Sequence, residues 1–437
     1  MIPGTSAQEI WDRRRPPKRN ADQATSPPRH SKEAVKIKLV ATLGIILAGL
    51  AGRSALDKVL TLRGGPDLVA IWGQLSSVIE LVAGVALAGV GTGISVLVAQ
   101  SARPEHQREL LRESLRIGLA LSAAAMLLVA AVSRAFPDHV AASGVSPSLL
   151  VLAAAVGCVA VIPGMINGYW LGQQRRDLMF ALALVSAALP LAASMMVRRT
   201  DILAAAALAQ AVPALAVILA FRSQPGPREF SAESQRGLMR LRRYVAAGLV
   251  IGILSPASML TARTIVSGAI SWHDAALLQS LWRISDWVGS VAAGILSVYF
   301  LPKLAAAYET PQFHAVLKRA AWMTIGPSAL VLALLFVAQQ PILQLLYDSS
   351  FRIPDGTVAL FLAGSLVRIA AWVPLFALYA MRRTLAIAAG EFLSLPLFAL
   401  LLAVFSRGLT LELAGILWLA SYLAYGAFNL WAVRSRR

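Results

Sequence analysis

Charged residues are scarce in this sequence, making up 14% of its 437 residues, while 57% are hydrophobic. Soluble domains contain about 25% charged residues, and one or two membrane anchors on such a domain would not lower that share so far. A membrane-spanning helix needs about 20 mostly apolar residues. The composition therefore predicts a chain that lies mostly within a membrane and has short loops.

Residues for metal or nucleotide chemistry are equally few. Cys158 is the single cysteine and lies in an apolar stretch, so one chain forms neither a disulfide nor a cysteine-based metal site. The five histidines show no metal-ligand spacing, and the sequence contains no Gly-rich phosphate loop. We therefore expect no cofactor, no metal and no built-in ATPase.

Acidic residues are outnumbered, with 22 Asp and Glu against 40 Lys and Arg, which gives a net charge of +18. A nucleic-acid-binding protein would gather such an excess on a basic face with interleaved aromatic residues. No such face stands apart from the apolar segments. In membrane proteins, basic residues instead gather in cytoplasmic loops. The charge therefore reports orientation in the membrane, and we expect no nucleic-acid partner.

Twelve apolar runs have the length of transmembrane helices, which predicts an all-α polytopic membrane protein. Residues 1–34, rich in Arg and Pro, are predicted to form a disordered, basic cytoplasmic tail. The runs cover residues 37–61, 68–99, 114–135, 146–170, 178–197, 202–221, 244–269, 276–302, 320–340, 356–380, 384–405 and 411–432.

Basic residues lie mainly in every second loop. If the tail is cytoplasmic, most basic loop residues share its side of the membrane. The few on the opposite side are Lys58, Arg63, Arg134, Arg198, Arg199, Arg352 and Arg407. The positive-inside rule then places both termini in the cytoplasm.

The two halves of the chain show a weak internal repeat. The second run ends near Ser95-Val96 and the eighth near Ser297-Val298, and each is followed by a polar loop and a run that opens with basic residues. The two units lie six runs apart, as in a parallel repeat; chance similarity of amphipathic loops is the alternative. We predict two six-helix bundles, residues 35–222 and 244–437, joined by a cytoplasmic loop over 223–243.

Seven charged residues fall within the predicted helices. Each charge at a helix centre costs about 2.5–3.5 kcal/mol on insertion scales, so seven facing lipid would cost on the order of 20 kcal/mol. They are therefore expected to face one another or a water-filled cavity. Glu80, one of these seven, shares a helix face with Gln74, Ser76 and Ser77, and this polar patch predicts a wall of the cavity. The seven are Arg53, Glu80, Arg263, Arg283, Asp286, Arg368 and Glu391.

Some of these charges also have a purely structural explanation. Arg283 and Asp286 are three residues apart and can form an ion pair on one helix face. Arg53, near the outer end of its run, can extend to the membrane interface. Arg263 lies in the outer half of its run, between threonines, and the sequence shows no partner for Glu391. Arg368 is the residue that we place in the cavity.

Arginines outnumber carboxylates by four to three among these seven residues. The planar guanidinium group binds a phosphate through two hydrogen bonds. A water-filled cavity with this excess therefore suits an anionic substrate such as a pyrophosphate group. An exporter of organic cations should instead show an excess of carboxylates.

The seventh and eighth runs resemble a known family. The residues concerned are Pro256, Arg263, Ser271-Trp272, Gln279, Ile284-Ser285-Asp286, Ser297-Val298-Tyr299 and Leu301-Pro302. With them, residues 36–434 resemble Wzx-type flippases, and most nearly the lipid III flippases of the enterobacterial common antigen and the O-antigen translocases. The segment 347–351 and the regions around Arg53, Arg368 and Glu391 are similar more diffusely. Arg283 does not match the family pattern.

The resemblance implies a MATE-like fold of the MOP superfamily, in a bacterial inner membrane. It implies a flippase without enzymatic activity, which moves an undecaprenyl-pyrophosphate-linked oligosaccharide to the periplasmic leaflet by alternating access. The glycan would serve the synthesis of O-antigen, common antigen or exopolysaccharide. Membrane lipids and polysaccharide-assembly proteins are the other partners expected.

Charge pattern and resemblance together give the predicted site. The substrate-binding residues are Arg53, Gln74, Arg263, Arg283 and Arg368, and the coupling or ion-pair carboxylates are Glu80, Asp286 and Glu391. A MATE-like exporter of small molecules is the first alternative function. A membrane polysaccharide polymerase is the second, although the predicted outer loops leave little room for its chemistry.

Overall fold

A computed structural model describes residues 30–101, 103–136, 145–222 and 252–435, and these are mostly helical, with no strand among them. Helices satisfy every backbone polar group internally, as a lipid environment demands. The predicted tail lies outside the described residues except for 30–34, which are helical. The predicted loop 223–243 and the start of the seventh run also lie outside them.

The first half of the chain forms six spans. One of them, α3 to α4, is continuous through a widened π-helical turn at Leu87–Gly91. The helices are α2 (His30–Gly64), α3 (Pro66–Ala86), α4 (Thr92–Gln100), α5 (Pro104–Ala135), α7 (Pro147–Gln173), α8 (Arg176–Met196) and α9 (Ile202–Arg222). Proline in the first turn begins α3, α5 and α7, where its missing N–H costs nothing.

The second half repeats this arrangement. It opens with a helix over residues 252–269, and its second span again contains a π-helical turn, Leu296–Phe300. The other helices are α11 (Trp272–Ile295), α12 (Leu301–Ala307), α13 (Phe313–Val337), α14 (Gln339–Leu346), α15 (Asp355–Ala380), α16 (Thr384–Phe392), α17 (Leu395–Val404) and α18 (Leu411–Arg434).

The structure confirms the predicted fold, a polytopic all-α membrane protein of two six-helix bundles. Ten of the described helical segments are long and apolar enough to cross a membrane, and α2 and the 252–269 helix run beside them. Two features were not predicted. Helix α14 follows α13 directly, and the eleventh run is broken between Phe392 and Leu395.

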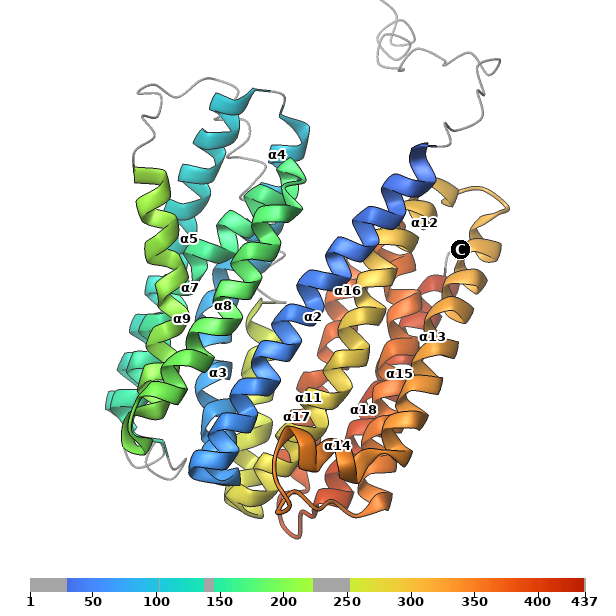
Figure 1. Ribbon diagram of the computed structural model, residues 1–437. Coiled ribbons are helices and arrows are strands. Elements are labelled where there is room, and N and C mark those ends of the chain that lie inside the picture. The colour runs from blue at the N-terminus through green and yellow to red at the C-terminus, as the bar shows by residue number, and fades with distance from the viewer. Residues whose placement is uncertain (1–29, 102, 137–144, 223–251, 436–437) are drawn as a thin grey trace, which may run out of the picture.

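Successive spans run in opposite directions and define two faces of the molecule (Figure 1). The terminal face holds the start of α2 and the end of α18. The distal face, at the other end, holds the turn between α2 and α3 together with α14. The halves meet where α3 and α2 pack against α11, while α2 also packs along α8.

A cluster of aromatic rings forms the core of the second half. Trp282 of α11 packs edge-on against Phe398 of α17, and its ring centroid lies 5.8 Å from that of Trp418 on α18. Phe361 of α15 completes the group at 6.0 Å from Trp418. Packed rings of this kind fix the position of α11, which carries two of the predicted site residues.

Candidate functional site

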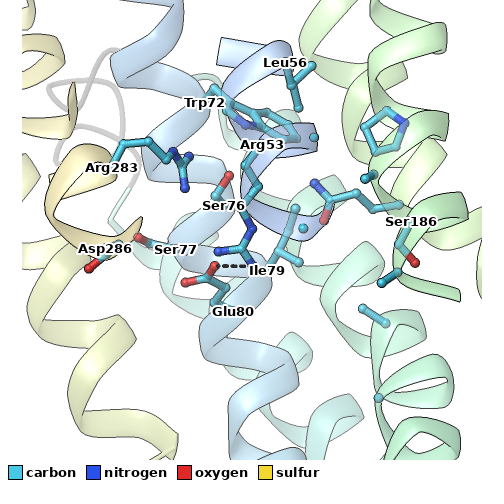
Figure 2. A pocket seen from close by; sticks show the side chains of 18 of the residues that line it. Arg53, Leu56, Trp72, Ser76, Ser77, Ile79, Glu80, Ser186, Arg283 and Asp286 are labelled. Carbon is cyan, nitrogen blue, oxygen red and sulfur yellow. Dashed lines mark ion pairs between the residues drawn. The ribbon is translucent and has the colours of Figure 1, made fainter. Parts of the chain in front are cut away.

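A cavity of about 400 Å³ lies between the two halves, within the membrane-spanning region. Helices α2, α3, α7, α8 and α9 line it from the first half, and α11 and the 252–269 helix line it from the second. Figure 2 shows its side chains. Five of the eight predicted site residues line the cavity: Arg53, Glu80, Arg263, Arg283 and Asp286.

Arg53 and Glu80 extend toward each other from α2 and α3 (Figure 2). Their charged groups are 3.8 Å apart, and the two side chains are 60% and 54% exposed. An ion pair that is this exposed contributes little to stability. Both side chains are therefore free to rearrange around a ligand. Arg53 points into the cavity, and the interface position that its sequence also permitted is not observed.

Arg263 is buried and connects three helices. Its guanidinium donates to Gln279 Oε1 on α11 at 2.6 and 2.9 Å, and on α3 to the Gly73 carbonyl at 2.8 Å and to the Ser77 hydroxyl. It also lies 5.3 Å from the ring centroid of Trp282, a favourable cation–π distance. No carboxylate in the described part of the chain forms an ion pair with it. Its positive charge therefore has no direct counter-ion.

Arg283 forms an ion pair across the two halves. Its Nε donates to Oδ2 of Asp57 on α2 at 2.8 Å, and the two side chains are 10% and 1% exposed. The ion pair between Arg283 and Asp286 that their spacing also permitted is not observed, since Asp286 pairs with Arg368. Asp57 was not among the predicted site residues, although it lies inside the first predicted run, and that position was the available signal.

Two further contacts strengthen this junction near the distal face. Lys58, the next residue of α2, donates to the backbone carbonyls of Gln344, at 3.0 Å, and Tyr347. The Tyr347 ring stacks on Phe351 with centroids 4.4 Å apart. Burial raises the pKa of the Tyr347 phenol well above its usual value, so its hydroxyl stays protonated. We call the contacts of Asp57 and Lys58 with the second half the distal latch.

Asp286 forms an ion pair with Arg368 of α15 at 3.0 Å. The Arg368 side chain is 9% exposed, whereas that of Asp286 is 44% exposed and reaches the cavity. The guanidinium carbon of Arg368 lies 5.3–5.9 Å from three ring centroids, those of Trp372, Trp418 and Tyr422. Arg368 therefore sits behind Asp286 and acts on the cavity through it.

The remaining two predicted residues lie away from the cavity lining. Gln74 is buried and donates to the Thr264 hydroxyl at 3.0 Å, joining α3 to the 252–269 helix. Glu391, at the end of α16, accepts a hydrogen bond from the Tyr425 hydroxyl at 2.9 Å. The charged residues that line the cavity or pair with its lining are thus four arginines and three carboxylates, with Asp57 in the place of Glu391.

The first-half wall of the cavity consists largely of small residues. Gly49 and Gly52 of α2 line it beside Ala183 and Ala187 of α8. A Cβ atom on Gly52 would overlap Ala187, whereas one on Gly49 would meet nothing within 4 Å. Glycine at position 52 therefore permits the close approach of α2 to α8.

No protein-family model and no curated protein matches the sequence. Solved structures do match. One is an inward-facing multidrug resistance MATE family transporter of the MOP superfamily, at 15% identity and a TM-score of 0.64, covering 91% of this chain and 93% of the other. A MOP superfamily transporter from Pyrococcus furiosus, described as having a binding pocket of reversed polarity, matches at 13% identity and a TM-score of 0.64. The match covers 93% of this chain and 95% of the other.

The outward-facing form of a multidrug resistance MATE family transporter matches at 14% identity and a TM-score of 0.61, covering 91% of this chain and 95% of the other. Identities this low establish the shared fold alone. The chain therefore folds as the MATE transporters of the MOP superfamily do, with its charged cavity between the two halves of that fold.

Proposed function

We propose that the protein is a flippase that carries an undecaprenyl-pyrophosphate-linked oligosaccharide from the cytoplasmic to the periplasmic leaflet. The observation that carries the proposal is the excess of arginine around a cavity between two halves in the membrane. A Pyrococcus furiosus transporter of the same fold has a pocket of reversed polarity linked to a different function. The charge of the cavity, more than the fold, therefore points to the substrate.

Two arginines are placed to bind the pyrophosphate. Arg263 has no counter-ion in the described residues. Arg283 uses only Nε for Asp57, and its terminal nitrogens make no hydrogen bond to other described residues. The N–H groups on the terminal nitrogens of Arg283 can form charge-assisted hydrogen bonds with phosphate oxygens. Arg53, which is exposed in the cavity, supplies a third cation once it leaves Glu80.

Transport would proceed by alternating access. The hydrogen bonds observed between the halves, from Lys58, Gln74, Arg263 and Arg283, all lie on the distal side of the cavity. The cavity is therefore closed toward the distal face. The terminal face carries most of the basic loop residues, which makes it the cytoplasmic face. The described state would then receive the head group from the cytoplasm, while the lipid tail stays in the bilayer.

Export of the pyrophosphate gains from an inside-negative membrane potential. Each negative charge that moves outward across the full field gains up to about 2.3 kcal/mol per 100 mV. The three predicted coupling carboxylates differ in their partners: Glu80 and Asp286 contact arginines, and Glu391 contacts a phenol. Glu391 is the coupling candidate that we favour, because it is the one of the three without an arginine partner among the described residues.

Deletion of the gene tests the proposal directly. Lipid-linked oligosaccharides are measured in each leaflet together with surface polysaccharide. Complete units are expected to accumulate in the cytoplasmic leaflet, and complementation with Arg263→Gln should fail although folded protein is present in the membrane. Arg319→Gln, which removes an exposed arginine at the start of α13, is the matched control and should restore flipping.

The alternative is a MATE-like exporter of small molecules, which the solved structures of multidrug resistance transporters favour. Normal delivery of oligosaccharide to the periplasmic leaflet in the deletion strain, with increased sensitivity to toxic small molecules, would support the exporter and overturn the flippase.

A further inference from the structure

Arg283 belongs to two features at once. Its side chain lines the cavity, and its Nε forms the ion pair with Asp57 that is part of the distal latch. Figure 2 shows the side chain extending from α11 toward α3. A ligand in the cavity and the closure of the distal side therefore depend on the same guanidinium group.

We propose that Asp57 senses the anionic group of the substrate through Arg283, so that binding of the pyrophosphate weakens the latch and favours distal opening. The inference rests on the proposed function, and it adds a positioning residue to the site. Asp57 does not line the cavity, and its effect passes through Arg283.

Charge explains the direction of this coupling. An anion on the terminal nitrogens would lie one guanidinium group away from the Asp57 carboxylate, and the two negative charges repel each other. The pair is nearly dry, so water screens this repulsion only weakly. The anion also competes for the positive charge that holds Asp57. Its binding therefore lowers the free-energy cost of separating α2 from α11.

Unused hydrogen-bonding groups surround Asp57. Its second oxygen, Oδ1, is buried and has no hydrogen-bond partner among the residues that the structure describes. Ser54 Oγ, about one turn earlier on α2, and the Tyr347 hydroxyl are also buried with no partner in the described part of the chain. Buried polar groups are normally hydrogen-bonded, so their lack of partners in the closed state is unfavourable. The latch is thus closed with polar groups unsatisfied, and a modest change at Arg283 can open it.

Two measurements test the proposal on the purified full-length protein in nanodiscs. The first follows the distance between spin labels at Leu62 and Ser349 by pulsed electron paramagnetic resonance, in a Cys158→Ser background. These positions are exposed near the distal face, one on each half. The second measures the affinity for inorganic pyrophosphate by calorimetry, with sulfate at equal ionic strength as the reference anion.

In the wild type, pyrophosphate is expected to shift the distance distribution to longer values. Asp57→Asn should show the longer distances without pyrophosphate and should bind it about tenfold more tightly, within the usual range of coupling between two sites. Asp355→Asn is the matched control, because Asp355 is an exposed distal carboxylate that accepts its hydrogen bond from Gln339 within the second half. It should behave as the wild type.

Lys58→Gln provides a second test in case Asp57→Asn does not fold, since it leaves the ion pair intact. It should lengthen the distances without pyrophosphate and, by reciprocity, raise the affinity by a smaller factor. Unchanged distances and affinity in the variants would overturn the proposal. If wild-type protein binds pyrophosphate but the distances between its labels do not change, the proposed coupling is wrong while the proposed function stands. If it does not bind pyrophosphate, the proposed function fails as well.

Discussion

The two halves of the molecule hold their interior arginines in different ways. Arg263 and Arg368 of the second half are buried against aromatic rings. Arg53 of the first half is 60% exposed, and its carboxylate partner is 3.8 Å away. The second half therefore provides a preorganised anion-binding scaffold, whereas the first provides a wall of small residues with one adjustable charged pair. The following predictions test this difference, in order of their effect on stability.

Replacing Arg368 by Leu should have the largest effect. It removes the cation from beside Asp286 and also removes three cation–π contacts. Breaking a buried ion pair costs about 3–5 kcal/mol, and because Asp286 is partly hydrated we expect about 3 kcal/mol. Denaturation in SDS measures the free energy of unfolding. Arg352→Leu, in an exposed distal loop, is the control; an equal loss in both variants would contradict a preorganised second half.

Gly52→Ala should be the next most destabilising change, since its new Cβ atom would overlap Ala187 on α8. Overpacking of this kind costs about 1–3 kcal/mol. Gly49→Ala, one turn earlier, adds the same atom in open space and should stabilise the helix by up to about 1 kcal/mol. Opposite signs in the changes of unfolding free energy caused by the two substitutions support close packing of α2 on α8. Equal signs would show that the first half tolerates a wider spacing.

Tyr425→Phe tests a polar contact in the second half outside the cavity. It removes the hydrogen bond to Glu391, which is worth about 1.5 kcal/mol if the carboxylate is charged. The same measurement on Tyr425→Phe in a Glu391→Gln background gives the interaction energy. A coupling energy near zero would mean that the phenol does not hold Glu391 in place.

Arg53→Gln should change stability least, by less than about 1 kcal/mol, because the pair that it breaks is exposed. Flipping should nevertheless fall roughly tenfold, the loss expected for one charge-assisted hydrogen bond to the substrate. Arg116→Gln breaks a comparable surface pair with Glu113 on α5 and should leave flipping unchanged. Normal flipping by Arg53→Gln would remove this arginine from the proposed site.

Much of the fold could be predicted because the spans are long apolar runs, and most of the predicted runs lie on observed helices, apart from breaks in the ninth and eleventh. Helix α14 was missed because it has only eight residues and is rich in glutamine. The break before Leu395 had a weak signal in Pro396, which occupies the first turn of α17, a position that proline favours.

The site could be predicted less well, for a physical reason. Spacing along one helix reveals only neighbours on that helix, and here each interior ion pair joins two different helices. Arg283 therefore binds Asp57, 226 residues away, in preference to Asp286, three residues away. Identifying such pairs requires the three-dimensional packing of the helices. The sequence did identify seven interior charges, since each one interrupts an apolar run, but it missed Asp57, which lies near the end of its run.

The two π-helical turns, at Leu87–Gly91 and Leu296–Phe300, give a geometric reason for the asymmetry between the faces. One extra residue in a helix rotates everything beyond it by about 100°. Before the turns, α3 and α11 pack against each other as well as on helices of their own bundles, α3 on α5 and α7 and α11 on α13 and α15; beyond the turns, α4 packs on α5 and α7, and α12 on α13 and α15. The contact between the two spans thus ends at the turns while the packing within each bundle continues, so the separation of the halves toward the terminal face follows from the change in helical register.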